Sequence, residues 1–102
     1  MGVMMSDFTA LLTNETDEVT SAAVQWSNGH ACAFVTGTFG HNNTRVVFEG
    51  SVDGTAFAPI DGLDDISDPM VKYFQVTGHT YIRAKITNKN VSNPPNLTVS
   101  IS

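Results

Sequence analysis

Histidine and cysteine residues, which could bind a metal ion, are few and widely spaced in this chain. His30 and Cys32 share one face of a predicted strand, and His41 or His79 could join them from loops. This set lacks a second close pair of ligands. A second set could hold calcium, because hard cations prefer clustered carboxylates. Its members are Asp61, Asp64, Asp65 and Asp68, whose spacing matches no EF-hand loop. Surface histidines, a buried cysteine and a solvated acidic turn are the commoner situation, so we expect no metal site.

No group of residues has the spacing of a catalytic centre. A nucleophile needs an adjacent base and an orienting group, but the chain has no nucleophile elbow, no histidine paired with an acid and no glycine-rich phosphate loop. Carboxylate pairs for glycoside hydrolysis could be drawn from the ten acids, yet most of these fall in predicted loops, where solvent keeps their chemistry ordinary. The sequence therefore predicts a protein that is not an enzyme, with no catalytic residue and no cofactor.

Aromatic side chains raise the possibility of sugar binding, because sugar faces stack on exposed rings. The candidates are Trp26, Tyr73 and Tyr81. Trp26 ends an apolar strand face and is better explained as core. Tyr81 shares a predicted outward face with Arg83 and Lys85, which makes it the main candidate for stacking.

The composition suits one globular domain with a modest core, since the 102 residues are 41% hydrophobic and 15% charged. No apolar run is long enough to cross a bilayer, and the start lacks the basic and apolar regions of a secretory signal, so we expect a soluble protein that is not exported by that route. Cys32 is the only cysteine, and packing or partner chains must replace internal disulfides. We expect the sequons at Asn14, Asn42, Asn90 and Asn96 to be unglycosylated.

The net charge of −5 argues against nucleic acid as a partner, because phosphate binding needs a concentrated basic face. The charges are also unevenly distributed. Residues 1–69 hold all ten acids and one base, giving −9, whereas residues 70–102 hold four bases and no acid, giving +4. This split could steer one subunit onto another or onto an acidic surface, or acidic and basic strands could pair inside one domain.

A hairpin is predicted over residues 44–57. Val46, Phe48, Gly50 and Val52 alternate with Arg45, Val47, Glu49 and Ser51, which is the period of a strand. Asp53-Gly54 then supplies the residues of a two-residue type I′ turn, and residues 55–57 can begin the return strand.

Further strands are predicted from similar alternation. Segment 19–26 places Ala22, Val24 and Trp26 inward, and Asn28-Gly29 turns it into segment 30–39 as a first hairpin. The second segment has Ala31, Ala33, Val35 and Phe39 on one face and Cys32, Phe34, Thr36 and Thr38 on the other. Residues 59–69 form an exposed acidic loop, residues 70–77 a strand, and Gly78-His79 a turn. Segment 80–87 places Ile82, Ala84 and Ile86 inward, and a last strand does so with Leu97, Val99 and Ile101.

These elements predict an all-β fold, a single antiparallel β-sandwich of about seven to eight strands, either jelly-roll or immunoglobulin-like. The sandwich is expected over residues 15–102. Residues 1–14 carry Met4, Met5, Phe8, Leu11 and Leu12 without helix start or stop signals, and are expected to form an apolar arm. The arm covers its own sandwich by default, or it reaches a neighbouring chain.

Three stretches of the sequence carry a resemblance to a known family. Val-Phe-Glu-Gly-Ser-Val-Asp-Gly-Thr-Ala-Phe is followed downstream by Gly-His-Thr-Tyr-Ile-Arg-Ala-Lys-Ile and by a Leu-Thr-Val-Ser-Ile ending. Together they resemble small β-sandwich proteins of tailed-phage virions, in which an apolar-x-apolar-Glu-Gly-Ser-x-Asp-Gly strand precedes one with Tyr-Ile-Arg. The resemblance covers residues 34–102. Similar strand text occurs in sandwich modules that bind sugars.

The resemblance implies a non-enzymatic virion protein, made in the host cytoplasm. It would be a capsid decoration or cement protein that binds the major capsid protein or another virion protein, or a head or tail fibre module. Such proteins often act as homo-oligomers, commonly trimers, seated where capsomers meet. The rival hypothesis is a carbohydrate-binding module of a tail or fibre that uses Tyr81 in host attachment. A domain of a secreted adhesin is a third alternative.

If the chain assembles in this way, its apolar surface must be shared with copies or with a shell. We expect Met4, Phe8, Leu11 and Leu12 to dock an arm onto a neighbour. Cys32 and Phe34 are expected at a subunit seam. Tyr81, Arg83 and Lys85 are expected at a partner interface, with the two bases facing an acidic surface.

Overall fold

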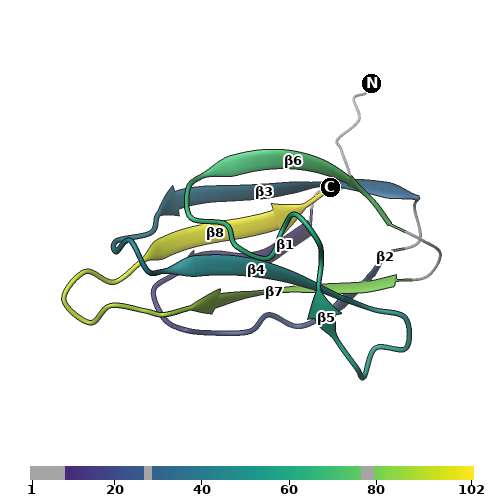
Figure 1. Ribbon diagram of the computed structural model, residues 1–102, viewed down its shortest axis with the longest axis horizontal. Coiled ribbons are helices and arrows are strands. Elements are labelled where there is room, and N and C mark those ends of the chain that lie inside the picture. Colours follow the sequence, from purple (N-terminus) through teal and green to yellow (C-terminus); the bar gives the residue numbers. More distant parts are fainter. Residues whose placement is uncertain (1–8, 27–28, 77–79) are drawn as a thin grey trace.

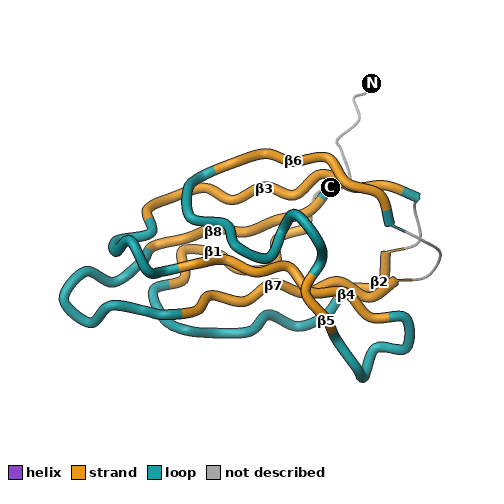
Figure 2. Tube along the Cα trace, in the orientation of Figure 1, coloured by secondary structure: helices purple, strands orange, loops and turns teal. Residues whose placement is uncertain are grey.

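The computed structural model describes residues 9–26, 29–76 and 80–102 of the chain. In these residues the chain forms eight β-strands and no helix, and so no helix that could span a membrane. Figures 1 and 2 show the strands stacked in two layers. The strands are β1 (Thr9–Glu15), β2 (Val24–Trp26), β3 (His30–Thr38), β4 (Arg45–Ser51), β5 (Ala58–Pro59), β6 (Met70–Gln75), β7 (Thr80–Thr87) and β8 (Asn96–Ile101).

The order of the strands identifies the topology. One sheet, which we call sheet A, has the order β1-β8-β3-β6, and the other, sheet B, has the order β2-β7-β4-β5. All neighbouring strands are antiparallel, and the first strand pairs with the last, the second with the seventh, the third with the sixth and the fourth with the fifth. This nested pairing is that of an eight-stranded jelly roll. The predicted antiparallel sandwich is confirmed, and of the two topologies left open by the sequence the jelly roll is the one present.

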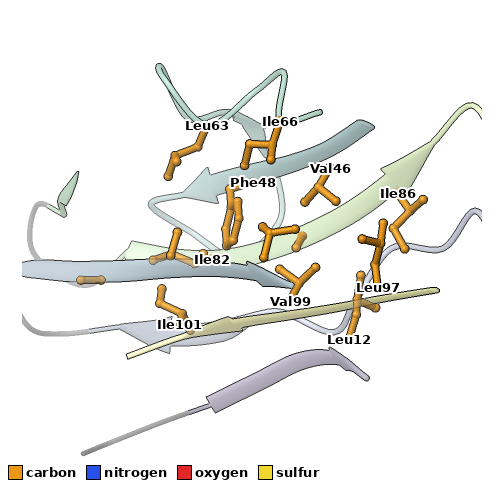
Figure 3. Close-up of a cluster of buried hydrophobic side chains, with 14 of the residues drawn as sticks. Leu12, Val46, Phe48, Leu63, Ile66, Ile82, Ile86, Leu97, Val99 and Ile101 are labelled. Atoms are coloured by element: carbon orange, nitrogen blue, oxygen red, sulfur yellow. The ribbon is translucent and has the colours of Figure 1, made fainter. Parts of the chain in front are cut away.

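The core lies between the two sheets, where the inward positions of the strands meet (Figure 3). In β7 the predicted inward residues Ile82, Ala84 and Ile86 are all buried, and in β8 so are Leu97, Val99 and Ile101. Alternation also holds in β3, where Ala31, Ala33 and Val35 are buried. Each of these strands covers the core with one face only, and the period of two in the sequence follows directly from that geometry.

The first predicted hairpin is wrong. Of segment 19–26 only β2 forms a strand, Ala22 is exposed, and Thr20 contributes an isolated bridge to Lys85. Strand β2 belongs to sheet B and β3 to sheet A, so the chain crosses between the layers instead of turning back on itself. Strands β6 and β7 lie in different sheets in the same way. Asn28, Gly78 and His79, which contribute to both predicted turns, lie outside the described residues.

The predicted hairpin of residues 44–57 exists, but its turn is longer than expected. Strand β4 ends at Ser51 and its partner β5 begins at Ala58, with Glu49 opposite Pro59. The connection is therefore the loop of residues 52–57 and not a two-residue turn. Its first residue, Val52, is 85% exposed and not in the core. The Asp53 carboxylate explains this loop, because its Oδ1 accepts hydrogen bonds from the Thr55 and Ala56 amides at 2.8 and 3.0 Å.

The loop of residues 60–69 is more than a solvated acidic turn. Leu63 and Ile66 are buried in the core, and main-chain hydrogen bonds tie them to β4. The Ile66 amide donates to the Val46 carbonyl at 3.1 Å, and the Phe48 amide donates to the Leu63 carbonyl at 2.9 Å. The aspartates between them remain exposed, so the loop closes the open side of the sandwich with two apolar side chains.

The domain begins earlier than the sequence indicated. Residues 9–14 belong to β1, which pairs with β8 at the edge of sheet A, so the expected boundary between residues 14 and 15 falls inside a strand. Leu12 is 5% exposed and part of the core, and Leu11 packs against it. These two residues therefore cover their own sandwich. Met4 and Phe8 lie outside the described residues.

Candidate functional site

The outer face of sheet A carries an apolar patch made by β3 and β6. The register of the two strands places Cys32 opposite Tyr73 and Phe34 opposite Val71. Val71 and Tyr73 are 63% and 60% exposed, and Cys32 and Phe34 are half-buried. The His30 ring lies against Tyr73, with ring centroids 5.3 Å apart. We call Cys32, Phe34, Val71 and Tyr73 the sheet A patch. It contains the two residues expected at a subunit seam.

The outer face of sheet B carries a charged cluster instead. The Glu49 side chain is 7% exposed, and its carboxylate lies 2.8 Å from the Arg83 Nε and 3.0 Å from the Lys85 Nζ. Burial alone would raise the pKa of Glu49, but the hydrogen bonds and charges of the two bases outweigh it and hold the pKa below its ordinary value. Arg83 and Lys85 thus already have an acidic partner within the chain, which weakens the expectation that they face an acidic surface elsewhere.

The loop of residues 52–57 contacts Arg83 of this cluster and the neighbouring Tyr81. The Phe57 ring lies under the Arg83 guanidinium, 3.9 Å from its carbon atom to the ring centroid. Gly54 has a positive φ of 80°, and a Cβ atom placed on it would lie 3.4 Å from the Tyr81 ring. The glycine backbone therefore rests on the ring, and Tyr81 is half-buried. A sugar could not stack on the ring face that this loop occupies. The structure therefore argues against Tyr81 as the residue on which a sugar stacks.

A polar cleft of about 540 Å³ lies where four loops meet. The loops before β4 and after β7 line it, together with Arg45 at the start of β4, one residue from the β1–β2 connection and one from the 60–69 loop. Figures 1 and 2 show the loops before β4 and after β7 at the same end of the sandwich. Its lining residues are Glu18, His41, Asn43, Arg45, Asp65, Asn88, Lys89 and Asn90. The sequence indicated that residues 40–43 and 88–96 are loops, but carried no signal that they meet.

Hydrogen bonds fix the two bases of this cleft. Arg45 donates from Nε to the Asp65 Oδ1 at 2.8 Å, and from Nη1 to the Asn42 and Thr44 carbonyl oxygens at 2.6 and 3.0 Å. Lys89 donates from Nζ to the Asp17 Oδ1 at 3.1 Å, and its amide donates to Glu18 at 2.9 Å. The Lys89 ammonium also holds the pKa of Asp17 below its ordinary value.

The predicted charge split is largely neutralised inside one chain. Three of the four bases after residue 69 pair with acids before it, namely Arg83 and Lys85 with Glu49, and Lys89 with Asp17. The fourth, Lys72, reaches the Gly62 carbonyl oxygen at 3.5 Å. Of the two explanations offered for the split, pairing within the domain is the one that these contacts support.

Neither of the two residue sets that were considered as metal sites in the sequence comes together in the part of the chain that the structure describes. Among the described residues, no group of three or more histidine, cysteine, aspartate or glutamate side chains is close enough to hold an ion. His30 lies against Tyr73, His41 lines the polar cleft, and Asp65 is paired with Arg45.

No protein family model, no curated protein and no solved structure gives a significant match to the chain. The sheet A patch and the polar cleft are the two surfaces from which a function can be argued.

Proposed function

We propose that this chain is a structural protein of a virion, a capsid decoration or cement protein that stabilises a head shell as a homo-oligomer, with a trimer favoured. The resemblance of residues 34–102 to small sandwich proteins of tailed-phage virions supports the role, and the jelly-roll order fits it by analogy, since jelly rolls are common among capsid domains. The proposal depends on one observation above all, the sheet A patch. A lone chain leaves Val71 and Tyr73 in water on one continuous face.

Burial of this patch between copies would stabilise an assembly. Full burial of a large apolar side chain contributes roughly 1.5–3 kcal/mol, so a patch of four residues repeated in each subunit supplies a useful part of an interface. The face of the strand, and not its edge, is the expected contact. Lys72 lies on the inward side of β6, which is an edge strand, and such an inward-pointing charge disfavours pairing with another strand.

The arm hypothesis is narrowed by the fold to residues 1–8. Leu11 and Leu12 are needed by the sandwich itself, so Met4 and Phe8 are the expected contacts with a shell. Deletion of residues 1–14 would remove β1 and unfold the sheet edge. Deletion of residues 1–8 leaves β1 in place, and it should abolish binding to shells while leaving the circular dichroism of the sheets unchanged.

The proposal is tested by the composition of purified particles. In virions produced from the genome that encodes this chain, mass spectrometry should find the chain at a high copy number that is a simple fraction of the capsid protein. Light scattering of the purified chain should give the mass of an oligomer. Absence from the particles, with the chain left in the lysate, would overturn the virion role whatever its oligomeric state.

A further inference from the structure

We propose that the polar cleft is a binding site for an uncharged saccharide. This site shares no residue with the sheet A patch, and it goes beyond the assembly role because it gives the chain a ligand of its own. It also differs from the rival hypothesis from the sequence, in which Tyr81 is the stacking residue, because Tyr81 does not line the cleft.

The balance of charge in the cleft selects the class of ligand. Among the lining residues, Glu18 and Asp65 contribute two negative charges and Arg45 and Lys89 two positive ones, and Asp17, which pairs with Lys89 without lining the cleft, adds a third negative charge. An anion such as phosphate would meet bases that are already paired with carboxylates. A cation would likewise meet carboxylates that are already paired with bases. A neutral ligand that both donates and accepts hydrogen bonds suits such a lining, and a sugar with many hydroxyl groups has this character.

Unused hydrogen-bonding capacity remains on the same residues. Among the described residues, no hydrogen bond is made by the Nη2 group of Arg45 or to the second carboxylate oxygen of Asp65. The Nδ1 of His41 accepts from the Asn43 amide at 3.1 Å, so the neutral ring carries its proton on Nε2 and can donate from there. The amide side chains of Asn43 and Asn88 add a donor and an acceptor each.

The backbone that presents Asn88 is fixed before any ligand arrives. Asn88 has a φ of 61°, in the left-handed region, and its carbonyl oxygen accepts from the Oγ1 of the fully buried Thr44 at 2.8 Å. Asparagine tolerates this conformation better than most residues, and glycine adopts it freely. A site held in this way loses little conformational freedom on binding, which favours affinity for a small polar ligand.

This geometry offers a matched pair of variants. Asn88→Gly removes the amide side chain from the cleft but keeps the left-handed backbone and the carbonyl that Thr44 requires. The control is Asn14→Gly, because Asn14 is the other left-handed asparagine among the described residues, with φ 47°, and lies outside the cleft lining. Its main-chain amide, which donates to the Thr98 Oγ1 at 3.1 Å, is kept in the variant.

The full chain should be tested on an array of immobilised neutral glycans and by amide NMR titration with free monosaccharides. The two assays distinguish binding to a glycan chain from binding to a free sugar. We expect binding in at least one of these two assays. In the NMR titration, the amide chemical shifts of residues 41–43 and 88–90 should change. Asn88→Gly should weaken saccharide binding about three- to tenfold, because one hydrogen bond to the ligand is lost. Asn14→Gly should leave the affinity unchanged. The proposal would be overturned if neither assay detects binding or if the chemical-shift changes are confined to the Tyr81 face. Binding of inorganic phosphate only, or an equal loss of binding in both variants, would also overturn it.

Discussion

The Nε of Arg83 lies 2.8 Å from the Oε1 of Glu49, across a directly opposed pair of residues on β7 and β4. Lys85 contacts the other oxygen of the same carboxylate, and the Phe57 ring covers the guanidinium. A carboxylate this deeply buried depends on its partners, because an unpaired charge there would lose its hydration without compensation. The outer face of sheet B therefore carries paired charges, whereas that of sheet A carries the exposed sheet A patch.

Replacement of Glu49 should destabilise the chain. Glu49→Gln keeps the shape but leaves two bases without a counter-charge, and we expect a loss of roughly 1–3 kcal/mol, since Arg83 and Lys85 are themselves about a third exposed. Urea denaturation followed by circular dichroism measures this. Asp65→Asn is the control, because its pair with Arg45 is at the surface and should contribute less than about 1 kcal/mol. Equal losses in the two variants would contradict a special role for the buried pair.

Stability should fall in acid, and Glu49 should account for part of the fall. The pKa values of Glu49, Asp53 and Asp17 are all below their ordinary values in the folded chain, that of Asp53 because of the Thr55 and Ala56 amides and the Ser51 hydroxyl. Groups with a lowered folded pKa stabilise fully above their unfolded pKa, about 4 to 4.5, and lose this as the pH falls through the folded value.

Urea midpoints should accordingly be level between about pH 7 and 5 and then decline. The gap between the wild type and Glu49→Gln should be widest on the plateau and close in acid. A gap that is constant with pH would show that the variant acts through packing and not through charge.

Gly37 should tolerate no side chain. Its φ is 108°, and a Cβ atom there would lie 2.1 Å from the Asn96 carbonyl oxygen on the paired strand β8. Gly37→Ala must distort the β3–β8 pairing, and we expect a loss above about 2 kcal/mol. Gly29→Ala is the control, because a methyl group at that position would meet no atom within 4 Å and no left-handed φ is required. Thermal unfolding of the two variants makes the comparison.

The sheet A patch should control oligomerisation. Val71→Ser and Tyr73→Ser remove exposed apolar groups, so they should leave the fold intact but reduce the oligomer to monomers in sedimentation experiments. Val91→Ser is the matched control, because Val91 is 87% exposed in the loop after β7 and outside the patch. An oligomer that survives both patch variants would move the interface elsewhere.

The sequence predicted the strands that cover the core with one face, because such strands impose a period of two on their own residues. It failed where burial has another cause. Leu63 and Ile66 are buried from an irregular loop, and Glu49 is buried on the outer face of its sheet beside its partners Arg83 and Lys85. Neither effect leaves a periodic signal.

Strand partners were equally hidden, since only β4 and β5 pair with a neighbour in sequence among the four nested pairs. The polar cleft combines residues from four separate segments, from Glu18 to Asn90, and alternation along the chain carries no information about such a meeting. The sheet A patch was found in part, because Cys32 and Phe34 stand out on a strand face that is not fully polar. That Val71 and Tyr73 also belong to the patch is seen only from the register of β3 with β6, which places them opposite Phe34 and Cys32.

The pairing of β1 with β8 has a consequence for biosynthesis. Thr9 lies opposite Ile101, so β1 cannot pair until β8, far along the chain, has also been synthesised. Pairing of residues so distant in the chain is slow, and the exposed edge of an unfinished sheet can associate with other chains. A nascent chain stalled before residue 96 lacks β8 and should therefore be sensitive to protease along β1, and sheet A should close only after β8 has left the ribosome.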